Sequence, residues 1–163
     1  MKPSVLIALF FLAFGVHASN DVHGHKDPNE IRLLKTPKRT LNTQYQYQLR
    51  NQPNWQNFLL DNGTWYVHFN EANGKPHYAF GKPIVVPGAN AREQAVYFVE
   101  HHLQGFGIPV NELEVATTTS NEHFNQVFFA QIHEGTKVLF SRVSVKLTLD
   151  GKVVGFGTDV FSQ

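Results

Sequence analysis

VFFAQIHEGTKVLFSRVSVKLTLDGKVVGFGTDV, which runs from Val127 to Val160, reads as three β-strands joined by two turns. From Val143 to Leu149 apolar and polar residues alternate, which is the pattern of a strand with one buried and one open face. The pair Asp150-Gly151 follows this strand and is typical of a tight hairpin. The stretch therefore predicts an antiparallel sheet whose apolar side packs on a helix.

The rest of the domain supplies that helix and further strands. A helix is predicted over Ala91 to Gln104, because Asn90 and Glu93 have capping-box spacing and Gly105 suits a left-handed terminator. Strands are predicted at residues 113–120, 124–133, 138–149 and 152–160, and an aromatic β-hairpin at residues 65–69 and 77–80. The predicted fold class is α+β, an antiparallel sheet of about four strands with one packed helix, preceded by the aromatic hairpin.

The N-terminal residues predict export. Residues 1–18 combine Lys2, an apolar run and small residues around Ala18, which is the pattern of a signal peptide. The apolar run of about twelve residues is shorter than the about twenty that span a bilayer. We expect cleavage after Ala18, a secreted, extracellular protein with no membrane partner, a mobile leader over residues 19–54 and the domain over residues 55–163. Within the leader, the alternation from Leu41 to Leu49 predicts an edge strand.

Charge and cysteine content narrow the function classes. The chain has 14 basic and 13 acidic residues, and loss of Lys2 with the signal peptide makes these numbers equal. Without a long basic run, nucleic acid is not an expected partner. The sequence contains no cysteine, so an exported domain of this kind depends on apolar packing instead of disulfides.

No motif predicts an active site, a cofactor site or a metal site. The nine histidines include no H-E-x-x-H pair, because Gly135 and Thr136 follow His133-Glu134. His101 and His102 are adjacent on the predicted helix and point in different directions, so the histidines are interpreted as surface and packing residues. The serines lack a G-x-S-x-G context. We expect a protein that is not an enzyme.

The C-terminal half resembles the propeptide domain shared by the fungalysin and thermolysin families of secreted metallopeptidases. The resemblance covers roughly residues 90 to 160 and rests on these positions: Leu103, Gly105, Gly107, Leu113, Gln131, Gly135, Val138, Ser141, Val143, Val145, Asp150, Gly151, Val153 and Val154. The family pattern favours an aromatic residue where His133 stands and a small or apolar one at Lys137.

The resemblance implies an inhibitor and intramolecular chaperone for a zinc metallopeptidase catalytic domain. Because no such domain follows before Gln163, the chain is expected either to act in trans or to be the remnant of a longer peptidase precursor. The outer sheet face is the expected contact, with Phe129, Arg142 and Lys146 as partner-binding residues.

A second hypothesis is an exported module that binds a peptide or a polysaccharide through an aromatic face. Trp65, Tyr66 and Tyr78 are the candidate residues. Exposure of these side chains favours this hypothesis, whereas burial of all three favours the propeptide role.

Overall fold

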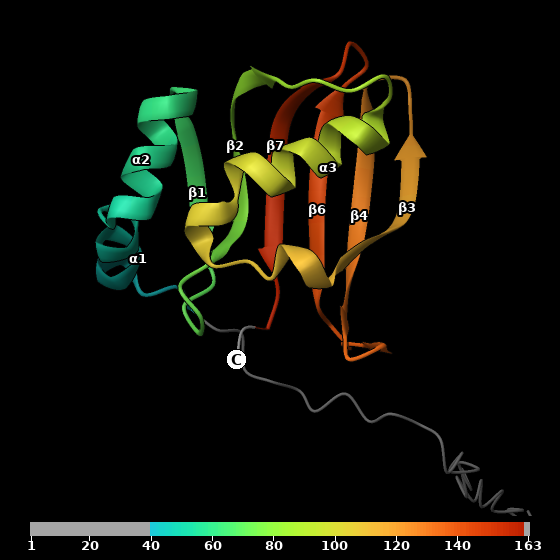
Figure 1. Ribbon diagram of the computed structural model, residues 1–163. Helices are drawn as coiled ribbons and strands as arrows, with labels where there is room; N and C mark the ends of the chain where they lie inside the picture. Colours follow the sequence, from blue (N-terminus) through green and yellow to red (C-terminus); the bar gives the residue numbers. More distant parts are fainter. Residues whose placement is uncertain (1–39, 162–163) are drawn as a thin grey trace, which may run out of the picture. The chain divides into compact units, whose positions relative to one another are not determined.

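The computed structural model describes residues 40–161 and contains an α+β domain built on one antiparallel sheet (Figure 1). The helices are α1 (Thr43–Arg50), α2 (Pro53–Asn62) and α3 (Ala91–His102), with short 3-10 turns η1 (Gln104–Phe106) and η2 (Val110–Glu112). The strands are β1 (Trp65–Phe69), β2 (Pro76–Val85), β3 (Leu113–Ser120), β4 (Phe124–His133), β5 (Thr136–Lys137), β6 (Arg142–Thr148) and β7 (Lys152–Asp159). The predicted class is confirmed, but the sheet has seven strands instead of about four, and α3 is not the only helix.

The aromatic hairpin is part of the main sheet. The strand order is β1-β2-β7-β6-β4-β3, and β5 pairs with β4. β2 joins the hairpin to β7 through pairs such as Ala79 with Phe156, with an irregularity between Phe80 and Ile84. The last strand of the chain therefore lies in the middle of the sheet and connects the hairpin to the C-terminal strands.

Two glycine turns set the register of the C-terminal strands. Glu134 and Gly135 both have positive φ, 48° and 74°, and they close the β4–β5 hairpin. Gly151 has φ 80°, as expected of an Asp-Gly turn, and its amide donates to the carbonyl of Thr148 at 3.0 Å. The prediction that Leu149 continues the buried row of this strand is wrong. Leu149 lies in the turn and is 58% exposed.

Helix α3 covers one face of the sheet and packs against β3, β4 and β6 (Figure 1). The predicted capping pair forms: the side chain of Asn90 accepts from the amide of Glu93 at 3.0 Å, and the Glu93 carboxylate accepts from the Asn90 amide group at 2.8 Å. The left-handed residue after the helix is Gly107 rather than the predicted Gly105. Leu103 directly follows the helix and its side chain is fully buried in the core, and the left-handed turn comes only after it.

Helix α1 and the first two residues of α2 lie in the region in which a leader and an edge strand were predicted. The strand prediction for Leu41 to Leu49 is wrong, because the Asn42 side chain caps α1 at the amide of Tyr45. Gln46 and Leu49, three residues apart, form its buried side. Regular structure thus begins before Trp55, and helix α2 starts with Pro53 at its first turn. The predicted cleavage site and leader residues 19–39 lie outside the described residues.

The core lies between the sheet and the helices. Trp55 and Phe58 of α2 stack at 5.2 Å, and Phe58 contacts Phe156 of the central strand at 5.4 Å. Phe98 of α3 contacts the other side of this cluster at 5.4 Å from Phe156. Within residues 40–161, no helix is long and apolar enough to cross a bilayer.

Candidate functional site: the open face of the sheet

The face of the sheet turned away from α3 is the candidate functional site, and we call it the open face. Cross-strand partners point to the same side of a sheet, so the register defines its members. It carries an aromatic cluster from β1 and β2, two glycines from β7, and basic side chains from β6 over phenylalanines of β4. In the part of the chain that the structure describes, no helix covers this face (Figure 1).

Three exposed rings form the aromatic cluster. Tyr66 stacks on Phe80 at a centroid distance of 5.5 Å, and Tyr78 lies 5.7 Å from Phe80. Their exposed fractions are 62% for Tyr66, 48% for Tyr78 and 45% for Phe80. Exposed apolar groups of this size in contact with one another are typical of interaction sites rather than of ordinary surface.

Beside the cluster, Gly155 and Gly157 of β7 form a strip of the open face that carries no side chains, which we call the glycine lane. Gly155 pairs with Phe80 of β2 and with Lys146 of β6, and Gly157 pairs with Ser144. A β-carbon at Gly157 would lie 2.6 Å from the backbone oxygen of His77, so no other residue fits the close approach of β2. The resulting lane separates the aromatic cluster from the basic side chains.

The far side of the lane is basic. The Lys146 Nζ lies 3.8 Å from the ring centroid of Phe124, and the Arg142 Cζ lies 5.5 Å from that of Phe128. Both distances are within the range of cation–π attraction. Among residues 40–161 neither cation is paired with a carboxylate. The open face therefore offers aromatic surface together with positive charge that is available to an acidic partner.

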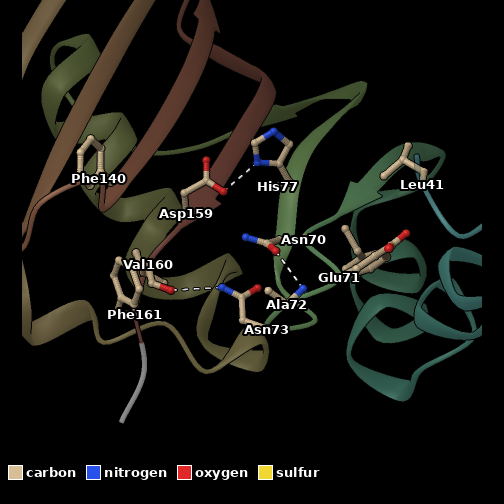
Figure 2. A pocket seen from close by; sticks show the side chains of 11 residues that line it. Leu41, Asn70, Glu71, Ala72, Asn73, His77, Phe140, Asp159, Val160 and Phe161 are labelled. Atoms are coloured by element: carbon tan, nitrogen blue, oxygen red, sulfur yellow. Dashed lines mark hydrogen bonds and ion pairs between the residues drawn. The ribbon is translucent and has the colours of Figure 1, made fainter. Parts of the chain in front are cut away.

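A second concave feature lies at one end of the sheet and has a volume of about 610 Å³ (Figure 2). Its wall carries a hydrogen bond between the Nδ1 of His77 and the Oδ1 of Asp159 at 2.7 Å. Three exposed apolar side chains line it: Leu41, Phe140 and Phe161. Its lining mixes these apolar side chains with polar ones. Nowhere in the described ranges do three metal-ligating side chains gather.

A partly buried network next to this hollow ties the last described residues to the sheet. The Gln131 side chain donates to the carbonyl of Phe161 at 2.9 Å and accepts from its amide at 3.1 Å. Glu112 accepts from Gln131 at 2.7 Å and pairs with the Nδ1 of His133 at 2.7 Å. These bonds from Gln131 and His133 hold the pKa of the Glu112 carboxyl below its ordinary value. The groups satisfy one another, which is the pattern of a structural network.

Comparison with known proteins finds no match in sequence and a weak likeness in structure. No family profile and no curated protein matches the sequence. The solved C-terminal domain of YpeB from Bacillus megaterium is similar over 74% of this chain, with 15% sequence identity and a TM-score of 0.42. The chain spans 64% of the length of that structure. A likeness at this level identifies neither a family nor a function.

The structure divides the predicted partner-binding residues between the two faces. Arg142 and Lys146 lie on the open face, as predicted, whereas Phe129 is 3% exposed and pairs with Val143 under α3. The prediction for Phe129 is wrong, because the row that contains Val127 and Phe129 is the core side of β4. Its neighbour Phe128 takes the expected place on the open face.

The predicted aromatic face is also altered. Tyr66 and Tyr78 are exposed, but Trp65 is 4% exposed and packs on Phe58 at 5.5 Å. Phe80 replaces it in the exposed cluster. The alternation of side chains along a strand could have predicted this arrangement. Trp65 and Tyr66 are adjacent and must point to opposite faces, whereas Phe80 is two residues from Tyr78 and points to the same face.

The histidines have separate environments. His102 hydrogen bonds Asn62 at 2.9 Å and stacks on Phe98 at 5.2 Å, while His101 is exposed. Burial lowers the pKa of His102, and the charge of His101 lowers it further. His102 thus packs beside the core and His101 is on the exposed side, although both rings lie near that of Tyr97, at 6.3 Å and 4.1 Å.

Proposed function

We propose that this chain is a binding module that docks an acidic protein surface on the open face, and that its partner is a secreted zinc metallopeptidase catalytic domain. The observation that carries the proposal is the juxtaposition of exposed rings with Arg142 and Lys146 across the glycine lane. Tyrosine and arginine are the side chains that most often dominate the energy of protein interfaces. The partner's identity comes from the resemblance to metallopeptidase propeptides.

The proposed mechanism is steric and thermodynamic. A module that binds the native peptidase and not its unfolded chain stabilises the folded enzyme by mass action. An interface of ordinary size buries about 800 Å² on each partner. Positive charge at Lys146 and Arg142 would steer an acidic partner, so the association rate falls as salt rises.

The test is to titrate secreted zinc metallopeptidases of the source organism with the exported chain. Three quantities are measured: the dissociation constant of the complex, the initial rate of the peptidase and its refolding yield. We expect Tyr66→Ser to weaken binding by about tenfold or more, as at an interface hot spot. Lys146→Glu should weaken binding most strongly at low salt. The matched control is Tyr47→Ser, because Tyr47 is 66% exposed on α1 and lies outside the open face. An equal effect of Tyr47→Ser would contradict the proposal.

A polysaccharide or a neutral peptide is the second candidate ligand, and the exposure of Tyr66 and Tyr78 favours it. Stacking on rings needs no charge, so the two candidates respond differently to Lys146→Glu. If a soluble polysaccharide binds, and if Tyr78→Ser abolishes that binding while Lys146→Glu leaves it unchanged, the module is a carbohydrate-binding or neutral peptide-binding one. If the chain binds neither a peptidase nor a polysaccharide or neutral peptide, the open face is not a binding site.

A further inference from the structure

The turn between β5 and β6 carries the most exposed large apolar side chain of the described residues. Phe140 is 90% exposed, and its neighbour Leu139 is 71% exposed. No ring contact of Phe140 is present within residues 40–161. The ring therefore contributes little to the packing of the domain, and its position needs another explanation.

The backbone at this residue is also unfavourable. Phe140 has φ 62°, a conformation that bulky side chains rarely adopt and that glycine adopts freely. A turn of this shape would fold more easily with glycine at that position. Two separate costs, exposure and backbone strain, thus fall on one residue, and such a coincidence points to a function in binding.

The chemistry around the turn indicates the partner. Lys137 and Arg142 flank Leu139 and Phe140 on either side, and both basic residues are exposed. The segment 135–149 contains three basic residues and no acidic one, and Glu134 lies in the preceding turn. Two further exposed apolar residues, Leu41 and Phe161, line the same hollow as Phe140, and Leu41 lies on its opposite side (Figure 2). Apolar side chains at a tip with basic flanks match the layered chemistry of an anionic lipid surface.

We propose that the turn carrying Leu139 and Phe140 inserts into the interface of an anionic lipid bilayer, while Lys137 and Arg142 contact the headgroups. Apolar side chains enter the boundary of headgroups and acyl chains, and nearby basic residues add attraction to the negative surface. The attachment is peripheral and reversible, and it involves no spanning segment. It departs from the expectation that the exported chain has no membrane partner, and it shares Arg142 with the docking proposed for the open face.

The test is flotation of the exported chain with two kinds of vesicle, pure phosphatidylcholine and phosphatidylcholine mixed with phosphatidylglycerol. We expect binding to the mixed vesicles, and we expect added salt to weaken it. Phe140→Gly should reduce binding by about ten- to hundredfold, the equivalent of one buried phenylalanine. The same variant should melt no lower than the parent chain, because glycine relieves the strained φ. Lys137→Glu should reduce binding to the mixed vesicles alone.

The matched control is Leu60→Ser, which removes an 82% exposed leucine from α2 and should leave vesicle binding unchanged. Failure of the parent chain to float with the mixed vesicles would overturn the proposal. Equal binding to both kinds of vesicle would also overturn it, since the basic flanks would then have no part. If Phe140→Gly instead abolishes docking to the peptidase and vesicles are not bound, the tip belongs to a protein cleft and the lipid assignment is wrong.

Discussion

Gln46 on α1 and Phe69 at the end of β1 exchange two hydrogen bonds. The Gln46 Nε2 donates to the carbonyl of Phe69 at 2.9 Å, and the Phe69 amide donates to the Gln46 Oε1 at 3.0 Å. Val67 lies two residues before Phe69 on β1, and its carbonyl accepts a hydrogen bond from the Arg50 side chain of α1 at 3.4 Å. The outer edge of β1 is thus satisfied by side chains of a helix, which protects the edge from pairing with another chain.

Replacement of Gln46 by leucine should therefore destabilise the domain more than its size suggests. Gln46 is 2% exposed, so Gln46→Leu leaves a buried amide and a buried carbonyl of Phe69 without partners, at a cost of roughly 1–3 kcal/mol for each buried group. Gln48→Leu, an exposed position on the same helix, should change stability by less than about 0.5 kcal/mol. Urea unfolding of both variants provides the measurement, and equal midpoints would show that the edge is not held in this way.

Adjacent phenylalanines on β4 should respond very differently to truncation. Phe129→Ala removes a core ring and should destabilise by about 3–5 kcal/mol. Phe128→Ala removes a half-buried ring whose main partner is Arg142, and should cost about 1 kcal/mol. Phe129→Asp should unfold the domain instead of removing a contact selectively. A larger effect at Phe128 in thermal unfolding would reverse the assignment of the two faces.

Local patterns predicted the main helix and the C-terminal strands, except that residues 138–141 of the predicted strand 138–149 lie in the turn between β5 and β6. The alternation from Val143 to Leu147 and the capping pair Asn90 and Glu93 are local signals, and the structure contains both. Which side of β4 faces the core cannot be predicted from a local signal of this kind. It follows from the pairing of Phe129 with Val143, a contact between strands that single-strand periodicity does not encode.

Contacts between distant parts of the chain account for most of what sequence reasoning missed. Helix α1 contains Gln46 as a buried residue, and its role depends on Phe69, which lies 23 positions further along the chain. The open face was predicted only in part for the same reason. Arg142 and Lys146 are visible as polar alternation, but their placement over Phe128 and Phe124 depends on the register between β4 and β6.

Two glycines provide a matched test of backbone strain. Gly151 has φ 80° and is buried, and a β-carbon there would collide with the Gln94 amide group. Gly151→Ala should destabilise by roughly 1–3 kcal/mol. Gly105 has no neighbouring atom within 4 Å of its would-be β-carbon and no positive φ, so Gly105→Ala should be neutral or stabilising by up to about 1 kcal/mol. The double variant Gly151→Ala with Gln94→Ala separates strain from crowding, and full recovery of stability would exclude strain.

The pair Glu112 and His133 should give stability a defined pH dependence. Hydrogen bonds from Gln131 and then from His133 lower the pKa of Glu112 from 4.5, and the hydrogen bond to Glu112 raises the pKa of His133 from 6.5. The glutamate's contribution is present above pH 4.5 and is lost as the pH falls through its lowered pKa. The histidine's contribution is present below pH 6.5 and is lost as the pH rises through its raised pKa.

The stabilisation by this pair should therefore be greatest between pH 4.5 and 6.5. The difference in unfolding free energy between the parent chain and His133→Gln should peak in that window and shrink toward alkaline pH, because the parent imidazole then loses its charge. His123→Gln, at an exposed position in the β3–β4 turn, is the control and should show no such peak. A difference for His133→Gln that stays constant from the window into alkaline pH would mean that the pair acts through neutral hydrogen bonding, with no contribution from charge.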